Sequence, residues 1–228
     1  MTSKLTLTAF VILLITTPLS MADPIVQKQN FSGITGFPDN LTFNKFNAGG
    51  TLTSVKITLN LQITGGSLII DNDSNNPIVG TFEFGINVAL YSADVSLTGG
   101  PIKAQALNSL SVNLGGNYND GDNDFSPDPP DGCLYNGSNV SDKESGLVSN
   151  LTQYEGSDTY NIAVLTSLHT EHDITSKFEY RVNPYPAVNG YVEVSYTYDP
   201  IPEPATVTIL CLGAAFMLRD FRNSKSDI

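Results

Sequence analysis

Apolar and polar residues alternate strictly along several stretches in the middle of the chain. The clearest example runs from Val55 to Ile63, where every second residue is aliphatic and the residues between are Lys, Thr, Asn and Gln. A period of two places the apolar side chains on one face of a β-strand and the polar ones on the other. Each such stretch is therefore predicted to be a half-buried strand. The same pattern returns at 78–90, 110–114, 160–168, 178–182 and 192–198.

One-faced alternation also indicates how the strands are arranged. The strands of a parallel sheet are covered by helices on both faces and are apolar throughout, whereas these strands have one apolar face each. No stretch between Asp23 and Ile201 shows the 3.6-residue period of an amphipathic helix. About eight to ten short strands of this kind predict an all-β fold, namely an antiparallel two-sheet β-sandwich that is jelly-roll-like.

Two polar insertions separate the predicted strands. Residues 71–77 are short and rich in Asn, whereas 115–150 carry most of the acidic clustering together with several Pro and Gly residues. Because these residues interrupt regular structure, the second insertion is expected to be irregular. The dipeptide Gly65-Gly66 lies between two apolar stretches, and it predicts a tight hairpin that follows the strand ending near Ile63.

The N-terminal residues differ from the strand-rich middle. Residues 1–22 hold one positive charge, Lys4, then an apolar run, and finally small residues at Ser20 and Ala22. This order is typical of a secretory signal peptide, with the two small residues at the −3 and −1 positions of the cleavage site. An uncleaved anchor or a buried strand is the alternative, but the apolar run is short for a bilayer span. We predict cleavage after Ala22.

The C-terminal residues have three parts. A proline-rich stop, Pro202-Glu203-Pro204, precedes an apolar segment at 206–218, and a basic end follows. Proline prevents the last strand from continuing and leaves an extended peptide. Basic residues after an apolar segment stay on the cytoplasmic side, so we predict that 206–218 is a transmembrane helix. The basic residues are Arg219, Arg222 and Lys225.

This three-part order resembles the PEP-CTERM sorting signal, which exosortases of Gram-negative bacteria recognise. The resemblance rests on Pro202-Glu203-Pro204, the apolar segment and the basic end. It implies that signal peptidase removes the leader and that exosortase then acts at Pro202, Glu203 and Pro204. The apolar segment has only about 13 residues, fewer than the roughly 20 that cross a bilayer unaided. An ordinary single-pass anchor is the alternative interpretation.

The middle of the chain is similar to the choice-of-anchor E domain, which precedes such tails in many bacterial proteins. The matching stretches are Phe46–Val55, Leu151–Tyr160 and Tyr196–Tyr198. The family is named for its alternative anchoring signals, and it implies no enzymatic activity. The resemblance divides the chain into a signal peptide at 1–22, a β-sandwich surface domain at 23–198 and a sorting tail at 199–228. It implies export, transient anchoring in the inner membrane, and release to the cell surface or an exopolysaccharide matrix.

The charge of the chain limits its partners. There are 23 acidic residues against 11 basic ones, a formal net charge of −12. This charge repels nucleic acid and anionic membrane surfaces and attracts cations, and it also keeps an exported domain soluble. Cys133 lies in a polar loop and Cys211 in the apolar tail, so no disulfide framework is expected.

The acidic insertion holds the strongest candidate for metal binding. Asp120, Asp122 and Asp124 alternate with small polar residues, and carboxylates at this spacing can surround Ca²⁺ with oxygen ligands. Asp128 and Asp131 could add further oxygens. The loop lacks the invariant glycine and the closing glutamate of an EF-hand. A solvated acidic loop is the alternative, and no other cofactor is expected.

The chain's two histidines lie close together, within the run from His169 to Asp173. On a strand, His169, Glu171 and Asp173 would share one face; on a helix, His169 and His172 would. Either arrangement could bind a metal, but the run lacks the HExxH pattern of zinc proteases. We expect an exposed turn between strands.

No enzymatic activity is predicted. The sequence contains no G-x-S-x-G nucleophile elbow. A glycosidase needs two carboxylates on rigid elements facing one cleft, whereas Glu83, Glu179 and Glu193 are expected to face solvent. Sugar binding by stacking on exposed aromatic rings is a further possibility, although the chain has no Trp. The candidate platforms are Tyr118, Tyr135, Tyr154 and Tyr185.

Two functions are open for the β domain. The leading one is a structural or interaction role in an exported, exosortase-sorted protein of the cell surface or extracellular matrix. The alternative is a module that binds Ca²⁺ or a polysaccharide.

Overall fold

The all-β, antiparallel character predicted from the sequence is confirmed. The computed structural model describes residues 22–33, 36, 39–97, 101–117, 125–201 and 213. Contacts divide the chain into two units, of which the larger holds residues 24–47 and 52–196. Every pairing between strands described below is antiparallel.

Eleven strands and one short 3₁₀ helix occur in the described residues. The strands are β1 (Ile25–Gly33), β2 (Asp39–Asn44), β3 (Gly50–Thr64), β4 (Ser67–Asp71), β5 (Ile78–Tyr91), β6 (Lys103–Leu114), β7 (Gly132–Asn136), β8 (Val140–Leu147), β9 (Thr159–His172), β10 (Glu179–Val182) and β11 (Ala187–Pro200). The 3₁₀ helix, η1, is Leu151–Tyr154. The strand predicted at 160–168 is confirmed as β9, which extends to His172.

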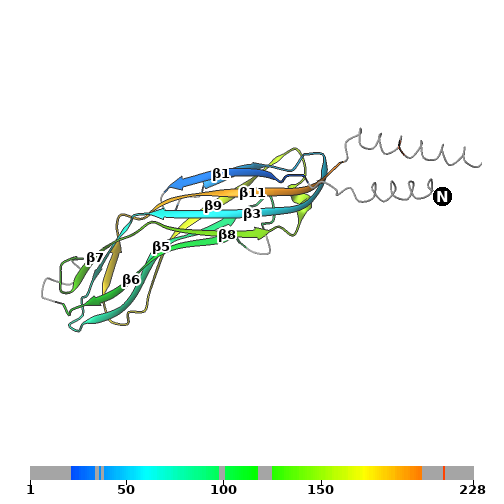
Figure 1. The fold of residues 1–228 in the computed structure, drawn as a ribbon. Coiled ribbons are helices and arrows are strands. Elements are labelled where there is room, and N and C mark those ends of the chain that lie inside the picture. The colour runs from blue at the N-terminus through cyan, green and yellow to red at the C-terminus, as the bar shows by residue number, and fades with distance from the viewer. Residues whose placement is uncertain are drawn as a thin grey trace, which may run out of the picture. The chain divides into compact units, whose positions relative to one another are not determined.

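The strands form three sheets, where two were predicted (Figure 1). The first sheet has the order β1-β11-β3-β8, and the second has the order β2-β9-β5-β6. A small third sheet has the order β10-β4-β7. Sequence neighbours are seldom sheet neighbours, so the fold depends on pairings between distant segments.

The first and second sheets face each other across an apolar interior. The aliphatic residues of β3 from Val55 to Ile63 are fully buried, as their alternation predicted. The second sheet contributes Ile86, Val88 and Leu90 of β5, which are also buried. The hydroxyl groups of Tyr160 and Tyr196 lie 2.8 Å apart and join β9 of the second sheet to β11 of the first.

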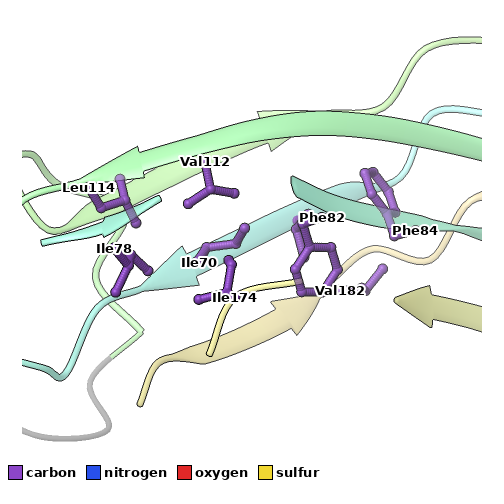
Figure 2. Close-up of a cluster of buried hydrophobic side chains, with 9 residues drawn as sticks. Ile70, Ile78, Phe82, Phe84, Val112, Leu114, Ile174 and Val182 are labelled. Carbon is purple, nitrogen blue, oxygen red and sulfur yellow. The ribbon is translucent and has the colours of Figure 1, made fainter. Parts of the chain in front are cut away.

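A second apolar cluster lies between the small sheet and the other halves of β5 and β6 (Figure 2). These two strands have 14 and 12 residues. At about 3.3 Å per residue they are long enough to reach both cores. The long hairpin of β5 and β6 therefore connects the small sheet to the rest of the fold. The buried members of this cluster are Leu68, Ile70, Ile78, Phe82, Phe84, Val112, Leu114, Ile174 and Val182.

The hairpin predicted at Gly65-Gly66 is wrong. The strand β4 does not pair with β3; it pairs with β7 and β10 in the small sheet. Gly65 and Gly66 have φ values of +67° and +86°, which redirect the chain out of the first sheet. A Cβ atom at Gly66 would lie 2.7 Å from Cγ of Pro186, so only glycine fits this crossing.

The expectation of an irregular insertion at 115–150 holds for the described residues up to Asp131 but is wrong for the residues that follow. The strands β7 and β8 both lie within it, and they pair with β4 and β3 respectively. The side chains of β8 are mostly exposed, so this strand has little apolar alternation to reveal it. Backbone pairing with a partner strand, rather than local propensity, makes these residues extended.

Side chains cover the edges of the two large sheets. Gln27 Nε2 donates to the Asn44 carbonyl oxygen at 2.9 Å, and the Asn44 N–H donates to Gln27 Oε1 at 2.9 Å, which joins β1 to β2. On the other side, the Gln105 N–H donates to Asp142 Oδ2 at 2.8 Å and joins β6 to β8. Open strand edges invite pairing with other chains, and these contacts oppose it.

Candidate functional site

The outer face of the second sheet carries a cluster of two glutamates and one histidine. Glu83 of β5 lies directly opposite Glu171 of β9, and His169 precedes Glu171 by two residues on the same face. One potential ligand atom from each of the three residues lies within 4.8 Å of the others. Nε2 of His169 is 3.6 Å from Oε2 of Glu171. We refer to these three residues as the histidine–glutamate cluster.

Neighbouring amides hold the histidine ring from its other side. Nδ1 of His169 lies 3.2 Å from Nδ2 of Asn87 on β5 and 3.5 Å from Nε2 of Gln105 on β6. The side chain of His169 is 18% exposed, whereas that of Glu171 is 73% exposed. The two amides therefore fix the position of the His169 ring, whereas the Glu171 carboxylate is accessible to solvent.

The sequence interpretation of this run as an exposed turn is wrong, because β9 continues through His172. The strand alternative is confirmed for His169 and Glu171, which share one face. Asp173 lies beyond the end of β9, where its carboxylate accepts the Thr81 N–H at 2.6 Å. That bond holds the pKa of Asp173 below its usual value.

Glu83 was expected to face solvent, and it is half-buried. The register between β5 and β9 brings it to the histidine, and no spacing in the sequence reveals that contact. The other two glutamates considered for catalysis lie elsewhere, Glu179 in the small sheet and Glu193 in the first sheet. The structure therefore does not bring these three carboxylates to one cleft.

A groove of about 550 Å³ adjoins the cluster and extends from the outer face of the second sheet to β8, the edge strand of the first sheet. Its lining includes Asn87 and Gln105, the two amides that hold His169. Lys103, Asp142 and Glu144 supply charges of both signs. Such a lining offers donors and acceptors for a polar ligand.

A second groove, of about 430 Å³, lies on the outer face of the first sheet. Its lining is rich in amide side chains, including Asn30, Asn60 and Gln62. Tyr191 also lines it, and the ammonium group of Lys28 lies 3.5 Å from the centre of that ring. Amides next to an aromatic ring provide polar and stacking contacts in one place.

The tyrosines proposed as sugar platforms have different positions. Tyr154 is fully buried and its hydroxyl donates to the Ser96 carbonyl oxygen at 2.9 Å, so its assignment as an exposed platform is wrong. Burial raises the pKa of its hydroxyl. Tyr135 packs edge-on against Phe84, with ring centres 5.8 Å apart. Tyr185 is 52% exposed, and Tyr118 lies outside the described residues.

Buried carboxylates gather at one end of the small sheet. Asp71, Asp73 and Asp131 are 2%, 9% and 2% exposed. The Asn72 N–H donates to the Asp131 carbonyl oxygen at 3.0 Å, which places the first polar insertion against the start of β7. Asp131 had been considered as an oxygen donor from sequence, whereas Asp71 and Asp73 were missed because the two insertions were treated separately.

The buried Asn72 organises this end of the sheet. Its side chain donates to two backbone carbonyl oxygens and accepts one backbone N–H, so it stabilises its own loop and ties that loop to the end of β6. Its partners are the carbonyl oxygens of Asn76 and Gly115 and the N–H of Ser74.

Several predicted residues lie outside the part of the chain that the structure describes. They are Asp120, Asp122, Asp124, Pro202, Glu203, Pro204, Arg219, Arg222 and Lys225, together with the signal peptide up to Met21 and, apart from Gly213, the segment 206–218. Among the described residues, no helix has the length and apolar character of a membrane span.

Burial raises the pKa of the Cys133 thiol, which does not favour a reactive thiolate.

No protein-family model and no curated protein matches the chain. Among solved structures, it is similar to a chain from the Gt strain of infectious bursal disease virus, with 16% identity over 82% of this chain and 45% of that chain and a TM-score of 0.14. A chain from T=1 particles derived from the same virus has 12% identity over 81% and 43%, with a TM-score of 0.15. The chain thus spans less than half the length of these viral chains. Scores of this size do not establish a common fold.

Proposed function

We propose that the chain is an exported bacterial protein that an exosortase sorts to the cell surface or extracellular matrix. In this proposal its β-strands form a jelly-roll-like sandwich with a structural or interaction role and no enzymatic activity. The observation that carries the proposal is the order of the chain's ends. A signal-like segment at 1–22 is combined with Pro202-Glu203-Pro204, an apolar segment and a basic end.

The positions of the first and last strands support this proposal. The strand β1 begins at Ile25, just after the proposed cleavage at Ala22, and β11 ends at Pro200, just before Pro202. The strands therefore fill the interval between the two processing points. Ile25 pairs with Tyr196, so the chain enters and leaves the larger unit at the same end of two neighbouring strands. This arrangement suits a precursor that is held at one membrane by both ends.

The covered sheet edges support an interaction role through the faces of the sheets. Recognition by strand addition needs an open edge with free N–H and C=O groups. Here Gln27 and Asp142 bond to the backbone at the edges of the two large sheets. The second groove, in contrast, lies on the outer face of the first sheet, and the first extends over the outer face of the second sheet as far as β8. We therefore place partner binding on the faces.

Replacement of Glu203 tests the sorting proposal. We expect the Glu203→Ala protein to remain in the inner-membrane fraction with its tail attached, and the unaltered protein to be recovered from the surface or medium without residues 1–22 and without the tail. Intact mass of both proteins measures the two cleavages directly. Asp220→Ala, in the same tail but outside the motif, is the control and should be processed normally. Unchanged mass and location of the Glu203→Ala protein would refute exosortase sorting.

The amide-lined groove of the first sheet favours a second candidate function, polysaccharide binding. We expect Tyr191→Ala to remove binding on a glycan array, whereas Tyr185→Ala, at an exposed tyrosine, should leave it intact. An array without signal for the unaltered protein would exclude this candidate.

Calcium binding by Asp120, Asp122 and Asp124 stays a prediction. Calorimetry with CaCl₂ tests it, using the full chain and the Asp122→Ala/Asp124→Ala double variant. Heat that the double variant loses would support the site; absence of heat in the unaltered chain would exclude it.

A further inference from the structure

Two buried polar atoms, one in the histidine–glutamate cluster and one in the neighbouring Asn87, have no hydrogen-bond partner among the described residues. One is Nε2 of His169, the ring nitrogen nearest to the Glu171 carboxylate, and the other is Oδ1 of Asn87. Buried polar atoms are almost always paired in folded proteins. Nε2 is the one of the two that faces a glutamate, so a group bound between the ring and the carboxylates would give it a partner.

Half-turns of the Asn87 and Gln105 amides would move the ring proton of His169 from Nε2 to Nδ1. The two amide nitrogens now lie 3.2 and 3.5 Å from Nδ1, and the two ends of an amide have nearly the same shape. After both turns, the two amide oxygens accept hydrogen bonds from a proton on Nδ1. The lone pair of Nε2 then points towards the glutamates. A histidine that donates from one nitrogen to a fixed oxygen and offers the other nitrogen is the usual form in metal sites.

The two glutamates supply an independent argument. Glu83 and Glu171 are directly opposite each other on neighbouring antiparallel strands. Like charges in that position destabilise a strand pair. A divalent cation between the carboxylates would remove this repulsion, and a neutral imidazole would add a third ligand without adding charge.

We propose that Glu83, His169 and Glu171 bind Zn²⁺ or another divalent ion of the first transition series. One imidazole nitrogen with two carboxylate oxygens suits such ions, whereas Ca²⁺ and Mg²⁺ prefer oxygen ligands alone. Asn87 is a positioning residue that orients the imidazole. Three protein ligands leave a coordination position open for water or for a polar ligand in the adjoining groove, and Glu171 gives access from solvent.

Titration of the metal-free full-length chain with Co²⁺ and then Zn²⁺ tests the proposal. We expect one ion per chain, visible absorption bands from bound Co²⁺, and displacement of Co²⁺ by Zn²⁺. The variants Glu83→Gln, His169→Gln and Glu171→Gln should each weaken binding at least tenfold. Asn87→Ala should weaken binding while leaving the number of ions per chain at one.

The second histidine of the chain provides the matched control. His172 follows Glu171 on β9 but packs against Phe82 and Phe178, with ring centres 5.7 and 4.8 Å away. His172→Gln should therefore leave Co²⁺ affinity unchanged. Absence of Co²⁺ bands with the unaltered chain, equal weakening by His172→Gln, or full affinity in Glu171→Gln would overturn the proposal. Because Glu171 is largely exposed, its variant remains informative even if His169→Gln does not fold.

Discussion

The buried tyrosine pair between the two large sheets gives a prediction with a definite order of effects. The hydroxyl of Tyr196 donates to the Asn44 carbonyl oxygen at 2.8 Å. Its single hydrogen is thus used, so in the 2.8 Å contact between the hydroxyls Tyr160 is the donor and Tyr196 the acceptor. Both side chains are fully buried. The two single Tyr→Phe changes therefore break different numbers of bonds.

The expected free energies follow from this direction of donation. Tyr160→Phe removes one hydrogen bond and strands no donor, so it should lower the free energy of unfolding by about 1 kcal/mol. Tyr196→Phe removes two bonds and leaves the buried O–H of Tyr160 without an acceptor, which should cost about 3 kcal/mol. Asn44 keeps a bond from Gln27, so its carbonyl adds little. The double change strands no donor and should cost about 2 kcal/mol, less than Tyr196→Phe alone.

Urea unfolding followed by circular dichroism measures all four proteins of this cycle. The slope of free energy against urea should stay the same, so that the midpoints rank the variants directly. The reasoning is refuted if Tyr160→Phe costs as much as Tyr196→Phe. It is also refuted if the double variant shows the sum of the two single losses, because strict additivity would mean that the hydroxyls do not interact.

Two further predictions concern pH and close packing. Burial raises the pKa of Tyr154 and Tyr160 and raises that of Tyr196 to about 12, so the unfolded chain releases these protons first as the pH rises above 10. Below pH 10 the full stabilisation is present. Above pH 10 each tyrosine should lower the free energy of unfolding by up to about 1.4 kcal/mol per pH unit. Urea midpoints from pH 9 to 11 check this, and a flat profile would contradict it. Gly190→Ala would press a Cβ against the Asn60 carbonyl oxygen and the ring of Phe31 and should cost at least about 2 kcal/mol. Gly33→Ala meets nothing within 4 Å and should be nearly neutral, and thermal unfolding compares the two variants.

The sequence predicted the strands that bury a full face and missed most of those that do not. The long alternations in β3, β5 and β9 correspond to rows of buried side chains. The strands β1 and β8 lie at sheet edges and are largely exposed, so they carry few apolar residues with which to mark their period. Their conformation comes from pairing with β11 and β3, which a local pattern does not encode.

Only the part of the candidate metal site that lies on a single strand could be predicted from the sequence. The spacing of His169 and Glu171 places them on the same face of any strand that contains both. Glu83 joins them through the register of β5 against β9, and the packing of apolar residues on the opposite, inner face fixes that register. Asp131 comes next to the end of β4 for the same kind of reason, because the pairing of β4 with β7 places Asp71 opposite Gly132.

Core packing does not determine the side chains on the outer face of the second sheet. The residues found there are therefore informative about function. Stability of β5 and β9 requires their inward residues, such as Phe84 and Ile162, which are fully buried. Nothing in this packing requires an imidazole held by two amides next to a pair of opposed carboxylates, an arrangement that lowers the stability of the strand pair when no cation is present. Because side chains also close the sheet edges, this face and its groove are the surface on which a partner of the exported domain should be sought first.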